Sequence, residues 1–388
     1  MTMTFDALIL TDPRFSGGTS AAVAADVQAM VAAGLKVGLA LVESVGFFQD
    51  LDVENAHILS LCNLPGVTRV PVTSHPRVAC DVAFFHHPSV YENPVQHAFP
   101  VDAKRSVLVA HQPLFKGDGA LAFDPFRVQR NIRRQFGPSL LWAPVSGTCR
   151  EQFRAYAPIL RMTQQDWPNT FDVSAWTPQR QKLQSKNLVI GRHGRAHPDK
   201  WPASGTDIAL SLPVGEQTSV RVMGADPEFL HEKGVDTADW TILEFNQQPV
   251  AEYLDGLDVF SYHHSPMWVE AFGRTIAEAM LMGVRCILSP ELEATFGPHA
   301  LYGRPDQVPA ILAHIRANLD EERAAALAAE DYCRNAYSVE TIARRFETLK
   351  TDTGTTTRSP RPKVSPLIAA KKLVGFRRRR WQASKDAR

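Results

Sequence analysis

The sequence predicts an α/β protein with two Rossmann-like domains that face a central cleft, followed by C-terminal helices and a basic tail. Short apolar runs alternate with longer segments of helical period through most of the 388 residues. Near-continuous apolar strands separated by helices are typical of parallel sheets that are covered on both faces. The alternation stops near residue 166 and then resumes, and the length of the chain also suits two domains.

The first domain is expected over residues 1–165. Its predicted strands are FDALIL, KVGLALV, CDVAFF, SVLVAH and LLWAPVS, and TSAAVAADVQAMVAAG is predicted as a helix. In open α/β sheets, ligands bind beyond the carboxyl ends of the strands. The turns that lead from strand to helix are therefore the expected place for a site.

A polar, proline-containing linker is predicted over residues 166–186, and the second domain over 187–335. Its predicted strands are NLVIG, SVRVMG, WTILEF, LDVFSYH, VRCILSP and ALYG. Its candidate helices are Pro249 to Gly256, Ala271 to Gly283 and Asp306 to Asn318. A C-terminal helix over 336–350 is expected to pack back on the first domain.

Residues 351–388 form the tail, in which a Thr/Pro-rich segment predicted to be disordered precedes the basic amphipathic stretch LIAAKKLVGFRRRRWQASKDAR. The tail holds eleven Lys or Arg against two Asp, a net charge of +9, so the remainder, with 31 against 39, carries −8. Each basic residue near an anionic leaflet contributes about 1 kcal/mol, so a peripheral membrane contact is one interpretation and a solvated tail the other. Nucleic acid is not expected as a partner, because the acidic body would oppose it.

Other features exclude several classes of protein. The sequence has no run of eighteen apolar residues and no signal peptide, which predicts a cytoplasmic location. The five cysteines are scattered and form no C-x-x-C pair, so neither disulfides nor a zinc site are expected. The histidine pairs at 86–87 and 263–264 lack a third ligand, and we predict no metal.

The stretch VEAFGRTIAEAMLMG contains two glutamates, Glu270 and Glu278. Apolar residues at helical period predict a helix that packs on the sheet, and on it Glu278 follows Arg274 by four residues, as in a surface ion pair. Glu270 precedes the helix, where unbonded N–H groups and the positive helix end suit either a cap or a ligand site.

The longer stretch SPMWVEAFGRTIAEAMLMGVRCILS resembles the E-x7-E signature of retaining glycosyltransferases of the GT-B architecture, most closely glycosyltransferase family 4 (glycosyl transferases group 1). One position departs from the signature, since Ala271 replaces its first glycine. The matching residues are Glu270, Phe272, Gly273, Glu278, Ala279, Met280 and Gly283.

The resemblance implies transfer of a sugar, with retention of its anomeric configuration, from a nucleotide-diphosphate-sugar to a hydroxyl acceptor. No cofactor other than this donor substrate is implied. Glu270 would accept hydrogen bonds from the sugar and Glu278 from the ribose. The backbone amides of Phe272, Gly273 and Arg274 would meet the sugar or the pyrophosphate.

The segment NLVIGRHGRAHPDKWP resembles the family's G-R-x-n-K element, whose cations neutralise the leaving diphosphate in place of a metal. Arg192 matches its arginine. The usual spacing to the lysine is shorter, so Lys200 is the first candidate and Arg195 the second. A charged surface loop is the alternative interpretation.

In the first domain, Gly17 and Gly18 of the segment SGGT resemble the family's glycine-rich first loop, although a plain strand-to-helix turn would look the same. His111 follows a predicted strand at the position of the family's histidine that faces the donor sugar. A structural role for a lone histidine at a strand end is the alternative.

The acceptor is not identified by the sequence. The segment FRVQRNIRRQFG, with Arg127, Arg130, Arg133 and Arg134, could meet an anionic or lipid-linked acceptor or could be a solvated helix face. Together with the basic tail it favours work on a sugar or lipid-linked acceptor, in surface polysaccharide or glycolipid synthesis at the inner face of a membrane. The alternatives are a nucleotide-sugar epimerase of the same architecture and a non-catalytic glycosyltransferase-like binding protein.

Overall fold

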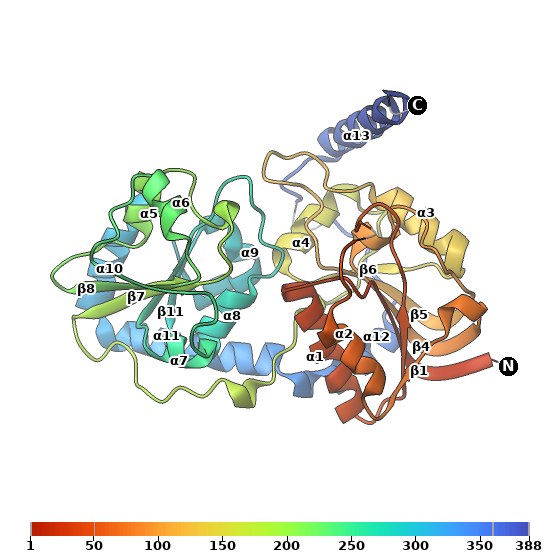
Figure 1. Cartoon of the computed structure of the whole chain (residues 1–388), viewed down its shortest axis with the longest axis horizontal. Helices are drawn as coiled ribbons and strands as arrows, with labels where there is room; N and C mark the ends of the chain where they lie inside the picture. The colour runs from red at the N-terminus through yellow and green to blue at the C-terminus, as the bar shows by residue number, and fades with distance from the viewer. Residues whose placement is uncertain (1, 50, 359–360, 387–388) are drawn as a thin grey trace. The chain divides into compact units, whose positions relative to one another are not determined.

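The computed structural model describes residues 2–49, 51–358 and 361–386 and divides the chain into two compact units (Figure 1). Unit 1 comprises Met1–Phe171 and Val339–Arg388, and unit 2 comprises Asp172–Ser338. Each unit contains a six-stranded parallel sheet with helices around it, as the sequence predicts. Among the described residues, no helix is both long and apolar enough to cross a membrane.

The sheet of unit 1 has the strand order β3-β2-β1-β4-β5-β6. Its strands are β1 (Thr2–Thr11), β2 (Val37–Leu41), β3 (Val67–Arg69), β4 (Arg77–His86), β5 (Val101–Ala110) and β6 (Leu141–Pro144). The apolar runs that predict strands coincide with five of these. The sixth, β3, has only three residues, of which two are exposed, and so it has no apolar run to reveal it.

The helices of unit 1 are α1 (Gly18–Ala32), α2 (Ala56–Ser60), α3 (Pro125–Phe136), α4 (Gly147–Phe153), α12 (Ile342–Thr351) and α13 (Pro366–Asp386). Helix α12 comes from the far end of the chain and packs against α1, β4 and β5. The apolar side chains of Ile342, Phe346 and Leu349 are buried there.

The sheet of unit 2 has the order β12-β11-β10-β7-β8-β9. Its strands are β7 (Leu188–His193), β8 (Thr218–Met223), β9 (Trp240–Leu243), β10 (Val259–Tyr262), β11 (Arg285–Leu288) and β12 (Leu301–Tyr302). Its helices are α5 (Gly205–Ser211), α6 (Pro227–Glu232), α7 (Val250–Asp255), α8 (Arg274–Leu281), α9 (Glu293–Phe296), α10 (Val308–Ala317) and α11 (Leu319–Tyr337).

The segment that the sequence predicts as a linker, 166–186, is divided between the units in the structure. Residues 172–186 belong to unit 2, where Arg180 pairs with Asp258 at 2.9 Å and Lys182 with Asp255 at 2.6 Å. These pairs hold the segment against the unit, although it lacks the apolar period that a sequence pattern can detect.

The segment after α12 is also bound more closely than its composition predicts. Thr355 exchanges two backbone hydrogen bonds with Met162, of 2.7 and 3.1 Å, and Asp352 accepts a bond of 2.8 Å from the backbone N–H of Gln164. The prediction of a disordered segment is therefore wrong for residues 352–355, because backbone pairing with a distant segment leaves no trace in composition.

Both sheets reverse their strand order beside their first strand. The reversal lies between β1 and β4 in unit 1 and between β7 and β10 in unit 2. Open α/β sheets bind ligands at such a reversal, beyond the carboxyl ends of the strands.

Candidate active site

The predicted site residues of unit 2 gather at the carboxyl edge of its sheet, at the strand reversal. Arg192 is near the end of β7, and Lys200 ends the short 3-10 helix Pro198–Lys200 that follows. Glu270 lies in the loop after β10, and Glu278 lies in α8. Four residues that are up to 86 positions apart are thus brought to one edge by the order β10-β7.

Glu270 is held as a buried carboxylate. Its Oε2 accepts hydrogen bonds from the Tyr262 hydroxyl at 2.6 Å and from Trp268 Nε1 at 3.2 Å, and Lys200 Nζ lies 3.9 Å away. Burial by itself raises the pKa of Glu270, but the positive charge of Lys200 and the two hydrogen bonds outweigh it, and the pKa is lowered. Glu270 is therefore ionised at neutral pH and acts as a fixed acceptor.

Lys200 is the cation that the structure places beside Glu270. Its ammonium group lies 5.4 Å from the centre of the Trp268 ring, and its side chain is 19% exposed. Arg195, the other candidate, is exposed in the loop after β7. The geometry therefore favours Lys200 as the partner in the G-R-x-n-K element.

Arg192 is bound by groups of the protein itself, whereas the resemblance implies the leaving diphosphate as its partner. Its guanidinium is buried, stacks on Trp201 at 4.1 Å, and donates hydrogen bonds to the backbone carbonyls of His263 at 2.9 Å and Lys200 at 2.6 Å. Burial lowers the pKa of Arg192 to about 10, so it remains charged at neutral pH. It ties the Lys200 segment to the end of β10 and adds a buried positive charge beneath the site.

Glu278 is not the surface charge that its spacing from Arg274 suggests. The ion pair exists, with Arg274 Nε 3.2 Å from Glu278 Oε1, but Glu278 is only 9% exposed. Its other oxygen, Oε2, lies 3.4 Å from Nε2 of His193. Burial raises the pKa of Glu278 to about 7 against the lowering effect of Arg274.

His193 is a member of this cluster that the sequence analysis missed. It ends β7 directly after Arg192 and is buried, and burial together with the charges of Arg192 and Lys200 lowers its pKa to about 3. Its Nε2 has no hydrogen-bond partner in the structure. A neutral imidazole thus faces a carboxyl group whose pKa is raised. The sequence does contain a sign that His193 is buried, because this histidine closely follows the predicted strand NLVIG.

Glu278 should make the stability of the protein depend on pH. The folded-state pKa of Glu278, about 7, lies above the ordinary value of 4.5, so folding favours the protonated carboxyl. The free energy of unfolding that this preference contributes is fully present below pH 4.5 and is lost as the pH rises through 7. We expect Glu278→Gln, which is neutral at every pH, to gain about 2.5 kcal/mol of unfolding free energy relative to the natural protein between pH 5 and pH 8. Urea unfolding at the two pH values measures this, and a difference that does not change with pH would contradict the buried-carboxyl account.

The start of α8 is shaped by Gly273. It occupies the N-cap position with φ 84°, in the left-handed region, and a Cβ there would lie 2.9 Å from Cδ1 of Ile276 and 3.3 Å from the ring of Phe296. Phe272 directs its own side chain into the core, 5.2 Å from the Tyr337 ring centre, so only its backbone could face a ligand. Arg274 is the first residue of the helix.

We expect Gly273→Ala to destabilise the protein by about 1–3 kcal/mol, because alanine is strained at this φ and crowds Ile276 and Phe296. Urea unfolding gives the value. Gly215→Ala is the matched control in the same unit, since nothing lies within 4 Å of its added Cβ and its φ is ordinary. Equal effects of the two substitutions would show that the left-handed turn before α8 is not required.

In unit 1, the other predicted site residues lie at the carboxyl edge of its sheet. Gly17, with φ 65°, is the N-cap of α1, and Gly18 begins that helix with open space where its side chain would be. His111 follows β5, and its Nε2 lies 3.0 Å from Nδ1 of His86 at the end of β4. His86 is fully buried, and its Nε2 is without a hydrogen-bond partner.

These histidines are uncharged at neutral pH. Burial lowers the pKa of His111 to about 4 and that of His87 to about 3, and it lowers the pKa of His86 well below its usual range. His87 also has a φ of 68°, which is rare for a residue with a side chain. A neutral pair, His86 and His111, thus lies at the carboxyl ends of the neighbouring strands β4 and β5.

No group of three or more potential metal ligands occurs in the part of the chain that the structure describes. His263 lies 3.2 Å from the Ser261 hydroxyl and 3.0 Å from the carbonyl of Gly303, and His264 lies 2.9 Å from the carbonyl of Ser265. The second histidine pair is therefore bound within the fold.

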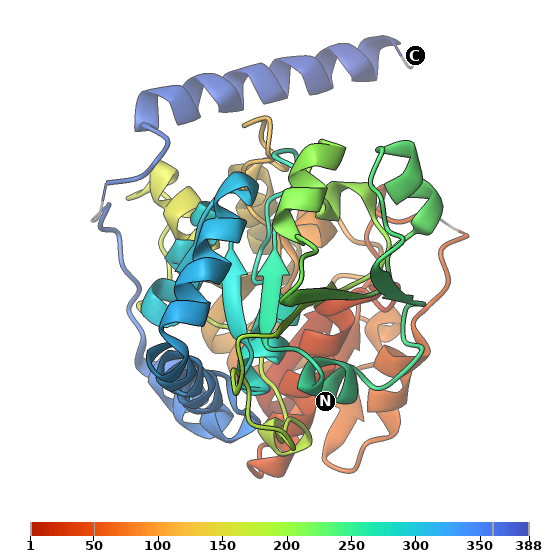
Figure 2. The ribbon, with the colours of Figure 1, turned by 90° about the vertical axis from the view of Figure 1, so that its left-hand side faces the viewer.

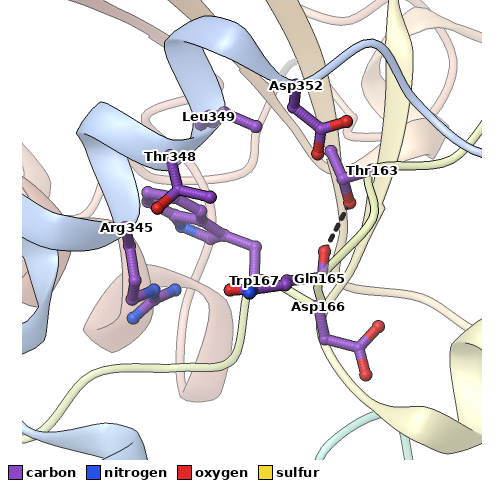
Figure 3. Close-up of a pocket in the computed structure, with 8 residues that line it drawn as sticks. All are labelled: Thr163, Gln165, Asp166, Trp167, Arg345, Thr348, Leu349 and Asp352. Carbon is purple, nitrogen blue, oxygen red and sulfur yellow. Dashed lines mark hydrogen bonds between the residues drawn. The ribbon is translucent and has the colours of Figure 1, made fainter.

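A small hollow in unit 1 is lined by other residues than these (Figure 3). It separates α12 from the segment that carries Thr163 and Trp167. Arg345 stacks on Trp167 at 4.2 Å and donates to the carbonyl of Pro168 at 2.8 Å, and Thr163 donates to the carbonyl of Gln165 at 2.6 Å. The two contacts of Arg345 hold α12 against this segment, so we interpret the hollow as part of a structural packing contact within unit 1.

Comparison with known proteins identifies the fold. No protein-family model matches the chain, and neither does any curated protein sequence. Among solved structures, HepE of Anabaena in complex with UDP and glucose is 16% identical, covers 89% of this chain and 100% of its own, and has a TM-score of 0.59. Sucrose-phosphate synthase of Thermosynechococcus elongatus is 15% identical over 89% and 98% of the chains, with a TM-score of 0.59.

WaaG, a glycosyltransferase involved in lipopolysaccharide biosynthesis, is 13% identical over 89% of this chain and 99% of its own, with a TM-score of 0.54. These similarities extend over both units. The chain therefore has the GT-B glycosyltransferase fold, as the sequence predicts.

Proposed function

We propose that the protein is a retaining glycosyltransferase that moves a sugar from a nucleotide-diphosphate-sugar to a hydroxyl acceptor. The observation that carries the proposal is the pair of Lys200 and Glu270, 3.9 Å apart, at the strand reversal of unit 2 with Glu278 in the following helix. Solved structures with the same fold contain UDP, glucose or UDP-glucose, which supports a nucleotide-sugar as the donor.

In this proposal each charged group serves one part of the donor. Glu278 accepts hydrogen bonds from the ribose hydroxyls, and Glu270, which is ionised, accepts them from the hydroxyls of the transferred sugar. Lys200 and the backbone at the start of α8, including Phe272, Gly273 and Arg274, face the diphosphate.

The reaction needs no carboxylate nucleophile. The bond between the anomeric carbon and the diphosphate oxygen breaks, the acceptor oxygen forms a bond to the same face of that carbon, and the acceptor proton passes to the departing diphosphate. The protein then contributes positioning and stabilisation of the charge that develops on the leaving group. Lys200 supplies that charge directly, whereas Arg192, bound to the Lys200 carbonyl, acts as a positioning residue.

The residues of unit 1 are assigned to the sugar and the acceptor. His111 and the loop at Gly17 and Gly18 lie at the carboxyl edge of the unit 1 sheet, where a ligand is expected. Uncharged His111 could donate or accept one hydrogen bond without adding charge. A role for these three residues in catalysis or donor binding remains part of the proposal.

The acceptor is proposed to be anionic or lipid-linked, as in surface polysaccharide or glycolipid synthesis. Helix α3 exposes Arg130, Arg133 and Arg134 on unit 1. Arg127, in contrast, is bound within the fold to the carbonyl of Glu92 at 2.7 Å and to Asn93 at 2.8 Å. Three exposed cations on one helix suit a phosphate-bearing acceptor, and the basic tail suits a peripheral place at the inner face of a membrane.

A thermal-shift screen with UDP, GDP, ADP and their glucose conjugates tests the function. A ligand that binds only the folded state raises its stability, so at least one nucleotide should raise the Tm. If none of them does, the proposed donor site is wrong. Product analysis with a labelled donor then distinguishes transfer to an acceptor from epimerisation, and the absence of any turnover would instead indicate a binding protein.

A further inference from the structure

Helix α13 lies against unit 1 through one of its faces. The Tyr156 hydroxyl donates a hydrogen bond of 2.7 Å to the carbonyl of Ala369, which is fully buried. Lys372, three residues on, donates to the carbonyl of Gly119. This face therefore begins with a buried alanine and a lysine that binds the body of the unit.

Two arginines extend the contact along the helix. Arg377 forms two bonds to the carboxylate of Asp124, of 2.6 and 3.1 Å, and Arg380 bonds to Glu92 and, at 2.9 Å, to Asn93. Asp124 also caps α3, and its pKa is lowered in part by Arg377. Part of the basic charge of the tail thus binds the protein itself.

The opposite face of α13 is exposed and both apolar and basic. Its members recur at i, i+4, i+7, i+11, i+14 and i+18, a spacing that aligns them along one side of a helix. We call this set the outer stripe: Leu367, Lys371, Val374, Arg378, Trp381 and Lys385, all of them exposed. Figure 2 shows α13 from the side as one long continuous helix.

The apolar members of the outer stripe are unusually accessible. Leu367 is 78% exposed, Val374 67% and Trp381 58%. Successive apolar members are seven positions apart, and one basic member of the outer stripe, Lys371 or Arg378, lies between each two of them. Lys385 lies 3.9 Å from the Trp381 ring centre, so the aromatic ring and a cation are already adjacent.

We propose that the outer stripe is a membrane contact, which lays α13 flat on an anionic leaflet while the inner face of the helix holds unit 1. Leucine, valine and tryptophan suit the boundary between headgroups and acyl chains, and lysine and arginine beside them attract lipid phosphates. The body of the chain carries −8, so it is repelled by an anionic leaflet, and the tail with +9 supplies the attraction.

Because the two faces of α13 bind different partners, the helix would hold unit 1 in a set orientation on the membrane and not only tether it. Arg377 and Arg380 fix the helix to unit 1, and the outer stripe fixes it to the lipid. The inference rests on the proposed function only in its consequence, that the acceptor is carried by the membrane; the contact itself follows from α13.

Co-sedimentation of the full chain with vesicles tests the inference. We expect binding to vesicles of phosphatidylcholine with phosphatidylglycerol, and little binding to phosphatidylcholine alone. The variant with Leu367→Ser, Val374→Ser and Trp381→Ser should partition at least about tenfold less. The variant with Lys371→Gln, Arg378→Gln and Lys385→Gln should lose a similar amount, and its residual binding should depend less steeply on salt.

The matched control replaces two exposed apolar residues elsewhere in unit 1, Leu51→Ser with Val53→Ser, which are 91% and 85% exposed. This variant should bind vesicles like the natural protein. Failure of the natural protein to bind anionic vesicles, or full binding by both stripe variants, would overturn the inference. So would self-association in light scattering that the serine variant abolishes, since the stripe would then be an interface between two copies.

The Tm rise with UDP, GDP or ADP, measured on the same variants, separates the two proposals. The stripe lies outside the donor site, so the nucleotide response should be unchanged in a variant that no longer binds vesicles. A natural protein that responds to the nucleotide but does not bind anionic vesicles overturns the membrane contact alone. A natural protein that binds the vesicles but shows no nucleotide response overturns the donor site alone.

Discussion

Replacing Glu270 by glutamine is expected to lower the rate of sugar transfer by about 10²- to 10³-fold while the affinity for the nucleoside diphosphate changes by less than about threefold. Glu270 is ionised, is fixed by Tyr262 and Trp268, and is proposed to hold the transferred sugar rather than the nucleotide. The amide has the same shape but lacks the charge. Initial rates and UDP, GDP or ADP titrations on the two proteins measure the two effects.

Glu244→Gln is the matched control, because Glu244 is an exposed glutamate that follows β9 in the same unit. It should retain full activity and stability. A Glu270→Gln protein that keeps more than half of the natural rate would refute the proposed role of this carboxylate. A folded Glu270→Gln protein that fails to bind nucleotide would instead move Glu270 to the nucleotide part of the site.

Lys200→Ala is expected to reduce kcat/KM by about 10²- to 10³-fold and to weaken nucleoside diphosphate binding by about tenfold or more. The reason is electrostatic. Lys200 is the partly exposed cation beside Glu270, and its positive charge is proposed to offset the negative charge that develops on the departing diphosphate. Steady-state kinetics and titration with the nucleoside diphosphate give both values.

Two further variants make this prediction specific. Lys186→Ala removes an exposed lysine just before β7 and should leave both constants unchanged. Lys200→Arg keeps the charge but changes its geometry, so it should recover part of the binding and less of kcat. If Lys200→Ala lowers kcat/KM and nucleoside diphosphate affinity no more than Lys186→Ala does, the diphosphate does not lie beside Lys200.

The sequence predicted the sheets well, because their strands are continuous apolar runs. The runs FDALIL and LDVFSYH overlap β1 and β10, each buried on both sides of the sheet. The strand β3 was not predicted, because three residues with two exposed side chains do not form an apolar run. Fold class follows from a repeated physical pattern, whereas a short edge strand depends on pairing with β2.

The candidate site remains a prediction, and the structure shows which of its contacts the sequence can indicate. The spacing of Glu270 and Glu278 places both on or beside one helix, but a helical period could not show that Glu278 is buried against His193, because that contact joins α8 to β7. The same limit applies to Arg192, whose bonds to two backbone carbonyls depend on the path of the chain after β7 and β10. The periodicity within one element can be detected in its own sequence, whereas the contacts between two elements cannot.

The tail shows the same distinction. Its charge and amphipathic character are visible in the sequence, where they allow either a membrane contact or a solvated tail. Only the structure separates the residues that bind unit 1, such as Arg377, from those that face outward, such as Arg378, which is its immediate neighbour. One position along a helix turns a side chain by about 100 degrees, so adjacent arginines serve different faces.

The most direct test of the central claim is a crystal structure of the full chain with the nucleoside diphosphate that raises its Tm. We expect the diphosphate to lie within hydrogen-bond reach of Lys200 and of the backbone at the start of α8, with the ribose hydroxyls on Glu278. A nucleotide bound elsewhere, for example at His86 and His111 in unit 1 or in the hollow beside α12, would contradict it.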